Sequence, residues 1–134
     1  MKELMQSEDY TPAFLKHFKE GERLFREADN QPDSKGGKAA LAVCATALEM
    51  HQWSEEAKAL ADIFAILDEK GRSAVLPIIA FRLSEIVILT RRTMSVYDDR
   101  SEATETEAQH LHTDAGRFIK AVQSAHSLAL AAGG

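Results

Sequence analysis

Apolar residues recur along this chain at intervals of three and four, the period expected when one face of an α-helix is buried. Thr11 is predicted to cap the first such helix, and Pro12 to occupy its first position, where proline loses no hydrogen bond. The apolar face then follows a 4-3-4-3 spacing through Phe14, Phe18, Gly21, Phe25 and Ala28. Residues 29–37 (DNQPDSKGG) are rich in turn-forming residues and are predicted to form the loop that ends this helix.

The segment 38–50 (KAALAVCATALEM) is apolar on nearly all sides and rich in alanine, which predicts a central helix. The polar stretch HQWSEE then interrupts or bends it. Ser54 is predicted to cap a following helix that Lys70 and Gly71 close as a basic last turn and a terminal glycine. Because no proline separates the two segments, a single bent helix over 38–70 is the alternative.

Two further helices are predicted in the C-terminal half. Ser73 is expected to cap the first, with Pro77 in its first turn and its end near Val96. The last helix opens with the acidic residues Glu102, Glu105 and Glu107, which suit the positive end of a helix dipole. Its apolar positions form a heptad pattern through Ala108, Leu111, Ala115, Phe118, Val122, Ala125 and Ala129.

These elements predict an all-α fold, a single-domain antiparallel bundle of four to five helices. We expect one domain over residues 1–134, with frayed termini at 1–9 and 132–134. No segment shows the period-2 alternation of a β-strand. The predicted core joins the larger apolar residues of all helices: Phe14, Phe18, Phe25, Leu41, Leu48, Leu60, Phe64, Leu83, Leu111, Phe118 and Val122.

The amino-acid composition indicates which kinds of partner and which cellular location to expect. The net charge of −5 disfavours binding to nucleic acids and to anionic membranes. The single Cys44 excludes an intramolecular disulfide and a cysteine-based zinc site. The first ten residues lack the apolar core of a signal peptide. The apolar run at 74–89 contains Arg82 and Glu85 and is too short to span a bilayer. We therefore predict a cytoplasmic protein that acts neither on nucleic acid nor in a membrane.

The last predicted helix carries the main candidate for chemistry. Glu107 and His110 have the ExxH spacing of di-iron bundles, and His112 and Asp114 follow. However, the heptad places His110 on the outward side, and a di-metal site needs inward ligands from four helices. The prediction is therefore that Glu107 and Asp114 pair with His110 on a solvated face. Metal binding, or phosphotransfer through His110, is the alternative function.

No catalytic motif, glycine-rich phosphate loop or cofactor motif is present, so we predict a non-enzymatic protein without a metal or cofactor. The expected function is protein interaction, as an adaptor, chaperone, inhibitor or immunity-type protein, or self-association as a homodimer. The predicted interface is one row of the 73–96 helix: Ile78, Arg82, Glu85, Leu89, Arg92 and Val96. Covering of this helix on all sides by the others is the alternative. A further alternative function is that of a DNA-associated regulator that binds through Arg91 and Arg92.

Overall fold

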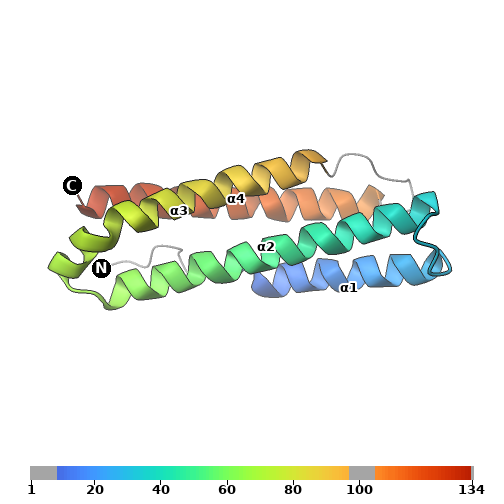
Figure 1. Cartoon of the computed structure of the whole chain (residues 1–134), viewed down its shortest axis with the longest axis horizontal. Helices are drawn as coiled ribbons and strands as arrows, with labels where there is room; N and C mark the ends of the chain where they lie inside the picture. The colour runs from blue at the N-terminus through green and yellow to red at the C-terminus, as the bar shows by residue number, and fades with distance from the viewer. Residues whose placement is uncertain (1–8, 97–104, 134) are drawn as a thin grey trace.

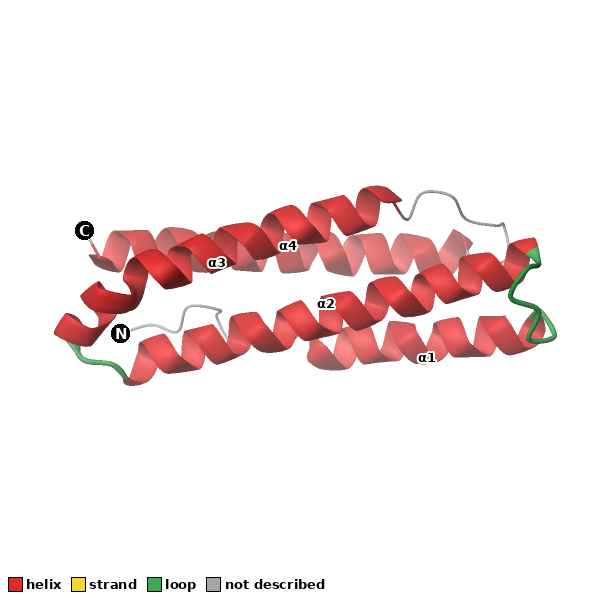
Figure 2. Cartoon of the chain, viewed as in Figure 1, coloured by secondary structure: helices red, strands yellow, loops and turns green. Residues whose placement is uncertain are grey.

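The computed structural model describes residues 9–96 and 105–133, and within them every regular element is an α-helix. The helices are α1 (Thr11–Glu27), α2 (Lys35–Ile66), α3 (Glu69–Val96) and α4 (Glu105–Gly133). They form an antiparallel bundle in which α1 packs mainly on α2 and α3 packs mainly on α4 (Figures 1 and 2). This confirms the predicted all-α fold class. Glu102 and most of the termini expected to be frayed lie outside the described residues, whereas residues 132 and 133 belong to α4.

The first helix begins where the sequence predicted, but its cap differs. Thr11 is the first residue of the helix and not its cap; the N-cap position is Tyr10, whose side chain makes no capping hydrogen bond. The backbone N–H of Thr11 donates to Asp9 Oδ1 at 3.0 Å. This contact lowers the pKa of Asp9 from its usual value. Pro12 lies in the first turn, where its missing N–H has no intrahelical acceptor to lose.

The second helix is continuous over 32 residues, so of the two alternatives the single helix is correct and HQWSEE does not interrupt it. Ser54 is not a cap but a buried residue in the middle of the helix, and its hydroxyl has no hydrogen-bond partner among the described residues. The actual cap is Ser34, whose Oγ accepts from the N–H of Gly37 at 2.9 Å. Polar residues at 51–56 fit within one unbroken helix because only Ser54 among them is buried, while Gln52 and Glu55 are exposed.

The boundary between α2 and α3 also lies earlier than predicted. Lys70 and Gly71 belong to the first turn of α3 and do not end α2. Asp68 caps α3, since its Oδ1 accepts from the N–H of Gly71 at 2.7 Å, so the predicted cap at Ser73 is wrong. Pro77 consequently lies inside α3 and not in its first turn. The described part of this helix reaches Val96, where its end was predicted.

The core lies between the two helix pairs and contains much of the predicted set. Six of those side chains are fully buried: Phe14, Phe64, Leu83, Leu111, Phe118 and Val122. Leu60 packs against this core while partly buried, and Phe18 and Phe25 are half-buried. Leu41 and Leu48 are exposed, which corrects their predicted place in the core. Because α2 is apolar on nearly all sides, its sequence did not indicate which side faces the core. In the structure Val43, Ala47 and Met50 face the core and are fully buried.

The first two helices approach closely at Gly21. A Cβ added there would lie 2.8 Å from Cys44 Sγ and 3.1 Å from the backbone N of Cys44. The absence of a side chain therefore lets α1 sit directly against the backbone of α2. With 17 residues, α1 is much shorter than α2 and runs beside only the half of α2 nearest their connection (Figure 1).

Candidate functional site

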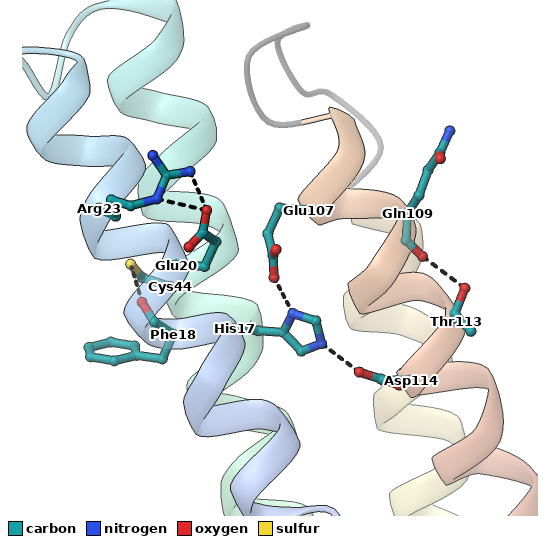
Figure 3. Close-up of polar contacts among 9 residues, drawn as sticks. All are labelled: His17, Phe18, Glu20, Arg23, Cys44, Glu107, Gln109, Thr113 and Asp114. Atoms are coloured by element: carbon teal, nitrogen blue, oxygen red, sulfur yellow. Dashed lines mark hydrogen bonds and ion pairs between the residues drawn. The ribbon is translucent and has the colours of Figure 1, made fainter.

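A buried histidine on α1 joins the first helix to the last. His17 is 5% exposed, and its ring lies between two carboxylates of α4 (Figure 3). Its Nδ1 contacts Glu107 Oε1, and its Nε2 lies 2.6 Å from Asp114 Oδ2. Glu107 and Asp114 can both reach one ring because they are seven residues, two helical turns, apart on the same face of α4.

The two contacts of this cluster depend on where its hydrogens lie. When both carboxylates are ionised they can only accept, so each contact then needs a hydrogen on the imidazole. An imidazole that donates from both nitrogens is the positively charged imidazolium. Held between Glu107 and Asp114, His17 then forms a three-member charged bridge, in which each hydrogen bond is charge-assisted.

An aromatic cluster lies next to this bridge. Tyr10 and Phe14 each meet the ring of Phe118, with centroids 5.4 and 5.6 Å away in edge-on arrangements. The ring of Phe14 is also 6.5 Å from that of His17. Two kinds of contact therefore hold α1 against α4 along the seam where these helices meet. Apolar rings pack in the core, and the charged bridge lies nearer the edge.

The bridge lies in a groove of about 520 Å³ between α1 and α4. Most of the residues that line it are polar: Ala13, Lys16, His17, Glu20, Glu107, His110, Thr113 and Asp114. Arg23 donates to Glu20 and lowers the pKa of that carboxyl. Within residues 9–96 and 105–133, no group of three or more His, Cys, Asp and Glu side chains is placed to hold a metal ion.

The structure changes the interpretation of the predicted ExxH segment. Glu107 and Asp114 contact His17 of α1, so their predicted pairing with His110 is wrong. His110 is exposed and lines the groove, in agreement with its outward heptad position. His17 was missed because its partners are 90 and 97 residues away. The sequence did contain one signal for its burial. His17 lies three residues after Phe14 and four before Gly21, and all three are buried on one face of α1.

The predicted interface row lies on the flank of α3 that turns toward α2. Arg82 is half-buried and donates to both carboxylate oxygens of Glu56 on α2, one of them at 2.8 Å, and also reaches Glu85 at 3.3 Å. This pairing lowers the pKa of Glu56 below its usual value. Leu89 is half-buried, Arg92 is exposed, and the side chain of Val96 lies outside the described residues.

The outermost face of α3 is more apolar than this predicted row. Ile78 is 70% exposed, Phe81 67% and Ile88 52%. With Lys70, Ala74 and Glu85 these residues recur every three or four positions and so share one side of the helix. We call the six residues Lys70, Ala74, Ile78, Phe81, Glu85 and Ile88 the outer stripe. It shares Ile78 and Glu85 with the predicted row, and it shows that α3 is not covered on all sides in the described chain.

A second groove, of about 440 Å³, contains the cysteine. Cys44 lies between α1 and α2 beside the half-buried rings of Phe18 and Phe25 and the exposed Leu41. Its thiol donates to the carbonyl of Phe18 at 3.6 Å. Burial, with a further contribution from the negative charge of Glu22, raises the pKa of the thiol. A raised pKa means less thiolate at neutral pH and lower reactivity.

The described chain is an all-α antiparallel helical bundle. Comparison of this chain with family models, with curated protein sequences and with solved structures finds no match.

Proposed function

We propose that this protein is a non-enzymatic protein-interaction module that binds through the outer stripe of α3. The observation that carries the proposal is the exposure of Ile78, Phe81 and Ile88 on one side of a single helix. Scattered exposed apolar residues are ordinary on a soluble protein, but a contiguous apolar row with charged residues among it is typical of an interface.

The alternative occupant of this face is a lipid bilayer. By length and composition alone, α3 could cross a membrane over Glu69–Ser95, which is longer than the apolar run at 74–89 that was predicted to be too short to span a bilayer. Two observations favour a protein partner. Arg82 is bound to Glu56 of α2, which ties α3 into the bundle, and the outer stripe itself carries Lys70 and Glu85. Charged groups within an apolar row suit a partner that supplies opposite charges, whereas the hydrocarbon of a bilayer supplies none.

The test is capture of a partner followed by reconstitution with the purified partner. The double variant Phe81→Glu with Ile88→Glu places charge in the stripe and should remove binding while the helical circular dichroism stays unchanged. Leu41→Glu is the matched control, because Leu41 is also an exposed apolar residue but lies on α2. Equal binding by all three proteins would refute the proposal.

A further inference from the structure

The outer stripe is complementary to itself. Resting on the proposed function, we infer that its partner is a second copy of this chain, bound with the two α3 helices antiparallel about a twofold axis beside Pro77 and Ile78. Closed twofold dimers are the commonest assemblies of soluble proteins, and they require one surface to match its own inverted copy. The order of residues along α3 meets this requirement.

One antiparallel register matches every member of the stripe from Lys70 to Glu85. Lys70 of one copy lies opposite Glu85 of the other, and Ala74 lies opposite Phe81. Pro77, which is also exposed, lies opposite Ile78. The residue numbers in these three pairs have the same sum, so a single alignment of the helices satisfies all of them. Symmetry then repeats each pair on the other side of the axis.

Size complementarity supports this register. Phe81 is a large ring that is 67% exposed, and the residue opposite it is the small Ala74, which leaves space for the ring between the helices. Ile78 packs beside the axis against the flat ring of Pro77. A large residue facing a small one is the arrangement that lets two helices interlock without clashes.

Charge complementarity favours an antiparallel over a parallel arrangement of the two α3 helices. Lys70 is exposed, and the side chain of Glu85 is 42% exposed although it also contacts Arg82. In the antiparallel register each lysine meets a glutamate at the edge of the contact. A parallel register would place lysine against lysine and glutamate against glutamate, and such like-charge contacts disfavour the wrong arrangement.

The contact extends beyond these pairs at both ends. Ile88 of each copy falls level with the α2–α3 turn of the other, where Ile66 is 84% exposed. Both isoleucines are otherwise open to solvent, so the same register removes apolar surface from water there as well.

The test measures the mass of the full chain by sedimentation equilibrium over a range of concentrations. The unmodified protein should have twice the mass of the chain, and Phe81→Glu should raise the dimer dissociation constant at least about 30-fold. Lys70→Glu alone and Glu85→Lys alone should each raise it about tenfold, and the two together should restore it. Helical circular dichroism checks that each variant is folded.

Four outcomes would overturn this inference. A folded protein that is monomeric at every concentration excludes the dimer, and a dimer that the double charge exchange fails to restore excludes the register. Binding of the monomer to vesicles of neutral phosphatidylcholine, lost with Phe81→Glu, would assign the face to lipid and overturn the dimer as well. A monomer that loses a captured protein partner with Phe81→Glu refutes the dimer but supports the proposed interaction module, so the two failures are distinguishable.

Discussion

His17 and Asp114 are 97 residues apart in the chain, yet His17 Nε2 lies 2.6 Å from Asp114 Oδ2. The contact joins the first helix to the last, which otherwise belong to different helix pairs. The bridge is therefore a specific point at which the packing of α1 on α4 can be measured.

Replacement of His17 by Ala should lower the free energy of unfolding by about 1–3 kcal/mol, because two partly buried carboxylates lose their donor. Urea denaturation measures the change. His110→Ala is the control, since His110 lies on the same helix face as Glu107 and Asp114 but is exposed. Its effect should be close to zero. If the two variants lose the same stability, the bridge contributes nothing particular to the fold.

Replacement of Phe118 by Ala should cost about 3–5 kcal/mol, as large-to-small changes in a packed core do. Phe118 is fully buried and meets Tyr10 and Phe14 edge-on, so the cavity opens in the middle of the aromatic cluster. Thermal and urea unfolding measure the loss. Leu130→Ala, at an exposed position of the same helix, serves as the reference. A loss well under 1 kcal/mol for Phe118→Ala would show that the ring is not packed as described.

The adjacent glycines at the start of α2 should respond in opposite ways to alanine. A Cβ at Gly37 would lie 1.8 Å from the carbonyl O of Gln31, a backbone atom, so Gly37→Ala must distort the loop and should destabilise the protein. A Cβ at Gly36 meets only Ala28 Cβ at 3.6 Å, an ordinary contact. Gly36→Ala should stabilise the helix by about 0.5–1 kcal/mol. Melting temperatures of the two variants test the difference in sign.

Acid should weaken the contact between α2 and α3. Arg82 lowers the pKa of Glu56 from its usual 4.5, so the stabilisation from this pair is present above that pH and is lost as the pH falls through the lowered value. Unfolding measured from about pH 6 down to about pH 3 should therefore show a weaker pH dependence in Glu56→Gln than in the unmodified protein. The neighbouring exposed Glu55, changed to Gln, is the control. Identical pH profiles for the Glu56 variant and the unmodified chain would contradict the assignment.

The sequence predicted best where one face of a helix is apolar and the other polar. In α4 the heptad positions Leu111, Phe118 and Val122 are all fully buried, as expected. In α2 the pattern could not choose a side, because alanine and larger apolar residues surround the whole helix; Leu41 and Leu48 were consequently placed in the core but are exposed.

The candidate sites depended on contacts that periodicity does not encode. Glu107 and Asp114 were identified as a polar pair, but the side chain between them comes from a helix at the other end of the chain. Likewise, Arg82 was placed on an interface row because nothing in its neighbourhood indicated that Glu56 of α2 would bind it. Such pairings are set by how the helices are rotated against one another, which the spacing within a single helix leaves open.

The pairing of each helix with its chain neighbour has a consequence for folding speed. Because α1 packs mainly on α2 and α3 mainly on α4, most contacts between helices join neighbours in the chain, an arrangement typical of a low contact order. Chains of this topology fold on the order of microseconds to milliseconds. Each helical hairpin can form before the two halves meet, so docking of the halves is the step that brings together the most distant residues. Formation of the His17–Asp114 contact would then report that last step, and a mutation there should speed unfolding more than it slows folding.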